Sequence, residues 1–242
     1  MLNLFRRLRR KLIDEGNLRK YMLYAFGEIL LIVLGILIAL QLNDWKEEAD
    51  QKTTEIKLLS ELYHDLEESE RRFTSSLEID REVLASKQVI IKVIDQNLPW
   101  HDSLQLHFNL FNFWETYSID ATAYKSIENW GINNLSNDTL RRQIVNIFQY
   151  ETHELAEMEE NERQVRLSSL NDIQSTTIDW NDIEKVHPVN HTAFLQNEEL
   201  STRLKAFKTY THLHMNARHR ILEKILQAKN TLKAEIMRLQ SR

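Results

Sequence analysis

An apolar run near the N-terminus dominates the hydrophobic pattern of the chain. It extends from Tyr21 to Leu42, and only Glu28 and Gln41 interrupt it. A helix of about 22 residues is roughly 33 Å long, which is enough to cross the roughly 30 Å hydrocarbon core of a bilayer. We therefore predict a transmembrane helix over residues 21–42.

The flanks of this run predict its orientation. The leader, residues 1–20, is basic, whereas residues 43–50 carry one lysine and four acids. By the positive-inside rule the leader stays in the cytoplasm and residues 43–242 are exported. The topology determinants are Arg6, Arg7, Arg9, Arg10, Lys11, Arg19 and Lys20. We expect a single-pass protein of the inner (cytoplasmic) membrane with a periplasmic C-terminal domain.

Two alternatives stay open at this stage. A cleaved signal peptide competes with an uncleaved signal anchor, but the apolar run is longer than a typical signal-peptide core, which favours the anchor. The leader either lies as a short amphipathic helix on the anionic inner leaflet or serves only to set the topology.

One charged residue lies inside the predicted span. The 14 residues after Glu28 are too short to cross the bilayer alone, so Glu28 is expected within the hydrocarbon. Glu28, Gly35 and Ala39 are spaced by seven and four residues and share one helix face. Small residues allow close helix approach, so we hypothesise that this face packs against another transmembrane helix, of a second copy or of a partner. The alternatives are a carboxylate that snorkels to the headgroups and, less favoured, a proton relay.

Heptad spacing continues beyond the membrane. Nine of the twelve a and d positions between residues 56 and 94 are apolar, a pattern typical of a long helix with a coiled-coil seam. Glu70, Asp80 and Lys87 interrupt the seam. Asn43 and Asp44 are only weak breaks, so this helix is expected to run on from the membrane helix.

The remaining pattern predicts two more long helices and two breaks. Pro99 ends the first helix and opens an irregular aromatic cap, 98–135, in which we expect short helices, one of them stopped by Gly131 in the left-handed αL conformation. A helix capped by Ser136, Asn137 or Asp138 continues to about residue 177. Its glutamate run, 151–162, is interpreted as a solvated face. A membrane-proximal loop, 178–196, precedes the last helix, 197–239.

These elements predict an all-α fold: an N-terminal transmembrane helix followed by an elongated up-down-up bundle with coiled-coil character. The cap would lie at the far end and the loop 178–196 near the lipid. Only 4 glycines and 2 prolines among 242 residues disfavour β-sandwiches and barrels.

Composition and charge narrow the function. Cysteine is absent, so disulfides and thiolate metal sites are excluded. Residues 43–242 hold 24 basic and 33 acidic residues, a net charge of −9, which argues against nucleic-acid binding. The nine histidines lack the spacing of a metal site, and no phosphate-binding glycine loop or catalytic motif occurs. We expect no cofactor, no metal and no enzyme.

Aromatic residues of the cap are the remaining candidates for a ligand site. They are Phe108, Phe111, Trp114, Tyr124 and Trp130. Packing in a core is the more common role of such a cluster, and a ligand pocket is the alternative.

Two stretches of sequence resemble a known family. They are Gly27-Glu28-Ile29 with Gly35 to Gln41 and Trp45, and Ala123 to Gly131 with Leu135, Leu140 and Arg141. They resemble an uncharacterised family of single-pass membrane proteins common in Bacteroidota, in which a small residue usually stands where Trp130 precedes the glycine. The resemblance implies a membrane-anchored helical protein carrying a domain of unknown function, and it implies no activity.

Together these features predict a non-catalytic helical scaffold or adaptor that acts by protein–protein interaction in the periplasm. Its expected partners are the lipid bilayer and either a second copy or another inner-membrane protein. The alternative is the sensory, ligand-binding subunit of a signalling system whose output lies in a partner protein.

Overall fold

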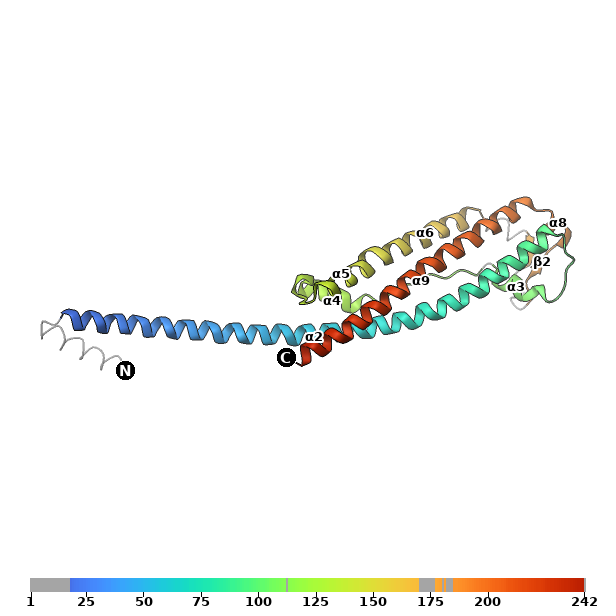
Figure 1. Cartoon of the computed structure of the whole chain (residues 1–242). Helices are drawn as coiled ribbons and strands as arrows, with labels where there is room; N and C mark the ends of the chain where they lie inside the picture. Colours follow the sequence, from blue (N-terminus) through green and yellow to red (C-terminus); the bar gives the residue numbers. More distant parts are fainter. Residues whose placement is uncertain (1–17, 112, 170–176, 180, 182–184, 242) are drawn as a thin grey trace. The chain divides into compact units, whose positions relative to one another are not determined.

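A computed structural model describes residues 18–111, 113–169, 177–179, 181 and 185–241 (Figure 1). The chain divides into two compact units, Met1–Thr54 and Glu55–Arg242, which are described separately. The described residues are nearly all helical, as predicted.

The first long element is helix α2, Leu18–Asp95, which is 78 residues long. It contains no break at Asn43 or Asp44, as expected from their weak breaking tendency. It is the described helix that is long and apolar enough to cross a membrane. Between Met22 and Leu42 its large apolar side chains have exposed fractions of 46–73%. Among the described residues, this stretch therefore has an exposed apolar surface.

In the second unit α2 contributes a broad buried face. Leu59, Leu66 and Phe73 on the predicted seam are fully buried, and so is Leu62 beside it. This face is wider than a two-stranded seam because it packs against more than one element. The helix ends where the sequence predicts, at Asp95, ahead of the Pro99 turn.

Shorter elements follow. In order they are α3 (Leu104–Leu110), α4 (Thr122–Trp130), the 3-10 helix η1 (Ile132–Asn134), α5 (Asp138–Val145), the π-helix η2 (Asn146–Glu151), α6 (Thr152–Ser169), β1 (Ile178–Asp179), β2 (His187–Pro188), α8 (His191–Leu195) and α9 (Glu198–Gln240). The two strands form a small antiparallel pair, which the sequence did not predict. The short helices expected in the cap are present.

Two local predictions near α4 can be compared with the structure. Asn137 is the N-cap of α5, and its side-chain oxygen accepts hydrogen bonds from the backbone of Thr139 and Leu140. Gly131 ends α4 with a positive φ of 103°, as expected of a glycine, but its ψ of 104° lies outside the αL region. A Cβ there would approach Nδ2 of Asn134 to 2.9 Å and would displace that amide, which donates to the carbonyl oxygen of Trp130.

The direction of the long helices corrects the up-down-up prediction. Within the second unit α2 and α6 both run antiparallel to α9, and thus parallel to each other (Figure 1). The pairs that establish this are Asp95–Lys205, Glu70–Lys229, Glu151–Arg220 and Glu159–Arg218. Between α3 and α4 the non-helical residues 113–121 run back along the bundle. Helix α6 therefore starts at the end of the second unit where α2 enters it.

The loop 178–196 also lies elsewhere than predicted. We expected it at the opposite end from the cap, but His191 Nε2 is 2.9 Å from the carbonyl oxygen of Leu98. The ring of Trp100 contacts those of His187 and His191 at centroid distances of 6.3 and 6.0 Å. The loop therefore packs on the end of α2 and on the first part of the cap.

Two separate apolar clusters form the core of the second unit. The first cluster includes Leu62, Leu66, Ile127, Ile144 and Ile221. The second cluster is formed by the end of α2, α3, the strands, α8 and the start of α9, and it includes Ile90, Phe108, Val186, Phe194 and Phe207. Each cluster is continuous within itself, and the residues between them are largely polar.

Candidate functional site

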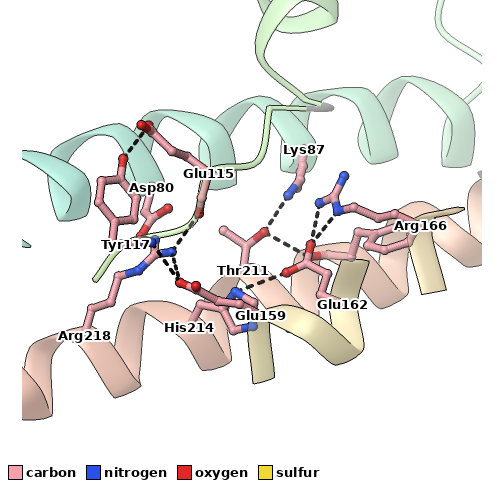
Figure 2. Close-up of polar contacts among 11 residues, drawn as sticks. Asp80, Lys87, Glu115, Tyr117, Glu159, Glu162, Arg166, Thr211, His214 and Arg218 are labelled. Carbon is pink, nitrogen blue, oxygen red and sulfur yellow. Dashed lines mark hydrogen bonds and ion pairs between the residues drawn. The ribbon is translucent and has the colours of Figure 1, made fainter. Parts of the chain in front are cut away.

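A buried layer of ionisable side chains lies between the two apolar clusters. Helices α2, α6 and α9 each contribute to it (Figure 2), and on α2 its members lie between Phe73 of the first cluster and Ile90 of the second. We call it the inner charged layer, and its members are Asp80, Lys87, Glu159, Glu162, Arg166, His214 and Arg218. Burying charged groups is costly unless they are paired, so their contacts determine what the layer contributes.

Arg218 holds one half of the layer together. Its side chain is 1% exposed and forms ion pairs with Asp80 of α2 and, at 3.0 Å, with Glu159 of α6. It also donates to the backbone oxygen of Glu115 at 3.0 Å. Its guanidinium lies 4.4 Å from the centre of the Tyr117 ring, a cation–π distance. One side chain of α9 thereby joins α2, α6 and the non-helical segment.

Glu162 is the centre of the other half. It accepts hydrogen bonds from Arg166 one turn later, at 2.5 and 2.7 Å, and its second oxygen lies 3.1 Å from Nδ1 of His214 on α9. The guanidinium of Arg166 stacks over Phe207 at 4.5 Å. These contacts join α6 to α9.

Lys87 contacts this second half from α2. It is 1% exposed, and its Nζ donates to the Thr211 hydroxyl at 2.5 Å. That hydroxyl in turn donates to the carbonyl oxygen of Phe207 at 2.9 Å. Burial and the nearby Arg166 charge lower the pKa of Lys87 to about 7. The amine is therefore a buried base that exchanges its proton near neutrality.

Two other groups in the layer have displaced pKa values. Burial lowers the pKa of His214, which keeps the imidazole neutral at neutral pH. Burial raises the pKa of Glu159, although Arg218 opposes this shift. The chemistry available to the layer is thus pairing of charges and transfer of protons among fixed side chains. Among the described residues, no group of three His, Asp or Glu side chains is arranged to hold a metal ion.

No family model, curated protein or solved structure matches the chain. Its function is therefore inferred from the residues themselves.

The predicted transmembrane face lies on the exposed apolar stretch of α2. Gly35 and Ala39 are exposed, and a Cβ on Gly35 would meet no atom within 4 Å. Glu28 is half-exposed. Of the topology determinants, Arg19 and Lys20 belong to the first turn of α2, and the other five lie outside the described residues.

The structure brings Phe108 and Phe111 together, at a ring-centroid distance of 5.6 Å, but it does not gather all five cap aromatics at one site. Phe108 and Phe111 belong to the second apolar cluster, whereas Tyr124 belongs to the first, against which Trp130 packs. Tyr124 stacks on Phe148 at 4.5 Å. Trp114 is half-buried beside Arg166, at 5.9 Å. Four of the five aromatics are thus packing residues of two different cores.

A shallow groove lies beside the inner charged layer. It measures about 450 Å³ and is lined by α2 residues and by the non-helical segment. Its lining includes Glu68, Arg71, Arg72, Glu115 and Tyr117. Tyr117 also covers Arg218, so the same residue forms part of the groove wall and part of the cover of the layer.

The inner charged layer was not predicted from the sequence. The glutamate run was interpreted as a solvated face, but Glu151, Glu159 and Glu162 are buried, and only their neighbours face water. The signal was present in the spacing: these three residues and Leu155 recur at helical intervals on one face. The basic partners of Glu151 and Glu159 lie more than 50 residues away on α9, which spacing along a helix does not reveal.

A π-helical turn positions another buried carboxylate, outside the inner charged layer. Glu151, at the end of η2, is 8% exposed in its side chain and pairs with Arg220 at 2.8 Å and with Lys224. Such turns are rare and displace the side chains that follow them. Here the turn orients Glu151 toward α9.

Proposed function

We propose that this chain is a single-pass, membrane-anchored helical adaptor that acts by binding other proteins. The observation that carries the proposal is α2 itself. One unbroken helix holds both an apolar stretch whose described large apolar side chains are exposed and a main packing face of the second unit. Such an element suits a protein that keeps a folded unit at a membrane.

The compartment and the orientation belong to the same proposal. Exposed apolar side chains over 22–42 favour lipid as their surroundings, because water would penalise each by about 1.5–3 kcal/mol. The basic leader favours a cytoplasmic N-terminus, and residues 43–242 would then form a periplasmic unit on an uncleaved signal anchor. The coiled-coil character of α2 and the resemblance to the Bacteroidota family remain part of this proposal.

Binding, rather than catalysis, is supported by how the described interior is used. Four of the five aromatic side chains considered for a ligand site pack in two cores, and most of the buried ionic groups are paired with one another. We therefore infer that the outer surfaces of the second unit and the Glu28 face of α2 contact partners.

Crosslinking mass spectrometry on native membranes tests the adaptor proposal. Wild type is compared with Glu28→Leu, and Gln41→Leu is the matched control because it removes the other polar residue of the apolar run. We expect one dominant membrane partner that is lost in Glu28→Leu and kept in Gln41→Leu. Self-links alone, unaffected by Glu28→Leu, would overturn the proposal and indicate a homo-oligomer with a snorkelling carboxylate.

A second candidate function is a sensory subunit, favoured by the groove beside the inner charged layer. A ligand that contacts Tyr117 or Glu115 there would also disturb their contacts with Arg218. The full chain in nanodiscs can be screened by thermal unfolding with amino acids, dicarboxylates and nucleotides. A shift with one of these classes that is lost in Arg72→Ala favours the sensor, and no shift with any of them favours the adaptor.

A further inference from the structure

The two apolar clusters of the second unit differ in how they are built. The first cluster joins long segments of α2 and α9 to α4 and α5. The second joins the ends of α2 and α9 to a seven-residue helix, two strands of two residues and a five-residue helix. Short elements with few internal hydrogen bonds open at lower free energy than long helices. The second cluster is therefore the part of the bundle expected to open first.

The contacts that the inner charged layer makes between α2 and α9 differ beside the two clusters. On the side of the first cluster, Arg218 ties α2 to α9 through the carboxylate of Asp80. On the side of the second cluster, the layer links α2 to α9 by the hydrogen bond from Lys87 to Thr211, a neutral hydroxyl, and the ion pair Asp95–Lys205 farther along is exposed. A protonated amine has three N–H donors and a full charge, and a hydroxyl neutralises none of it.

The charged groups that face Lys87 do not compensate for this. Arg166 on α6 opposes its positive charge, while Glu162 on α6 and Asp80 on α2 favour it. Both carboxylates are already engaged, by Arg166 and by Arg218. The surrounding titratable groups on the other packed elements are His214 on α9 and His107 of α3, whose Nδ1 is 3.1 Å from the hydroxyl of Ser86.

We propose that the inner charged layer is a proton-binding site, in which protonation of Lys87 loosens the second apolar cluster while the first stays folded. The neutral amine fits the layer, because Thr211 meets its hydrogen-bonding needs without an opposing charge. The protonated amine is stabilised by water, which it reaches when the second cluster opens. The proton would thus be the ligand, and the adaptor surface near α8 would change with pH.

The low pKa of Lys87, about 7, agrees with this geometry. In the opened state the amine is hydrated and regains a pKa near its ordinary value of about 10.4. Between these values opening binds one proton, so the opening constant rises up to about tenfold for each unit by which the pH falls. Below pH 7 Lys87 is protonated in both states, and its contribution becomes constant.

Hydrogen exchange of the full chain in nanodiscs, corrected for intrinsic exchange, tests the proposal between pH 9 and 7. We expect the amides of α8 and of the start of α9 to exchange through an opening that leaves residues 221–232 protected. The constant of this opening should rise up to tenfold per pH unit as the pH falls. In Lys87→Met the slope should vanish. Lys92→Met, an exposed lysine of the same helix, should keep it.

Two results would overturn the proposal. One is equal protection of both clusters, which would mean that the bundle opens only as a whole. The other is an unchanged slope in Lys87→Met, which would place the proton elsewhere. Protection of residues 221–232 reports whether Lys87→Met is folded. If it is not, Lys87→Gln, which can still donate to Thr211, is measured with the same two criteria.

Discussion

The apolar stretch of α2 and the inner charged layer place their side chains in opposite ways. From Met22 to Leu42 apolar groups are exposed, whereas around Arg218 charged groups are buried. Each arrangement is unfavourable for an isolated chain in water, and each needs a specific complement. For the stretch we propose that the complement is lipid. For the layer it is the set of opposite charges contributed by other helices.

The two regions differ in where the missing interaction comes from. The layer is complemented from within, so its energetics can be tested by removing one member. The proposed complement of the stretch lies outside the chain, so its role is tested by substituting a residue that a membrane would exclude.

Removing Arg218 should have the largest effect. Arg218→Ala leaves Asp80 and Glu159 buried without their cation, and breaking such a pair costs about 3–5 kcal/mol. Thermal unfolding of the full chain in detergent measures the loss. Arg163→Ala is the control, because its pair with Glu160 is exposed and should contribute little to stability. Equal losses in the two variants would show that the layer has no special role.

A charge in the middle of the apolar stretch should prevent stable insertion. Leu34→Arg adds an insertion cost of about 2.5–3.5 kcal/mol at a helix centre. We expect the variant to leave the membrane fraction on carbonate extraction, while Leu34→Ile remains. Retention of Leu34→Arg in the membrane to the wild-type extent would argue that the stretch does not span it.

The stability of the bundle should rise with pH above neutrality. The pKa of Lys87 is lowered to about 7 in the folded state, so between pH 7 and about 10 the unfolded chain binds more protons. The free energy of unfolding should therefore increase by up to about 1.4 kcal/mol per pH unit. Denaturant titrations at pH 7 and 9 measure the increase. Lys87→Met should show a smaller one, and an equal increase would assign the effect to other groups.

The helix cap of α5 should give the smallest effect. Asn137 accepts hydrogen bonds from two backbone amides at 3.0 Å, and its own amide donates to Glu235 at 3.0 Å. Asn137→Ala should cost about 1 kcal/mol in the same unfolding assay. Asn133→Ala, on the exposed 3-10 turn, should leave stability within about 0.5 kcal/mol of wild type.

Local features of the fold were predictable from the sequence. The apolar run, the heptads of α2 and the Asn137 cap depend on residues within a few turns of one another. The sequence also shows the three charged residues that interrupt the seam, but it does not show what they contact. In the structure they all meet α9: Glu70 pairs with Lys229, and Asp80 and Lys87 contact Arg218 and Thr211.

Long-range features were not predictable in this way. The direction of α6 depends on residues 113–121, and nine extended residues span up to about 30 Å, enough to return along the bundle. Nothing in their composition distinguishes an extended return from a turn at one end. The inner charged layer depends on that direction, since its partners meet only when α2 and α6 run parallel.

The proposed membrane anchoring can be tested most directly with single cysteines, because the natural chain has none. We would place one at Leu34, in the apolar stretch, and one at Glu78, on the exposed side of α2 in the second unit. Intact spheroplasts are then treated with a membrane-impermeant maleimide. We predict labelling at position 78 and none at position 34. Labelling at position 34, or labelling at position 78 only after lysis, would contradict a periplasmic unit anchored by α2.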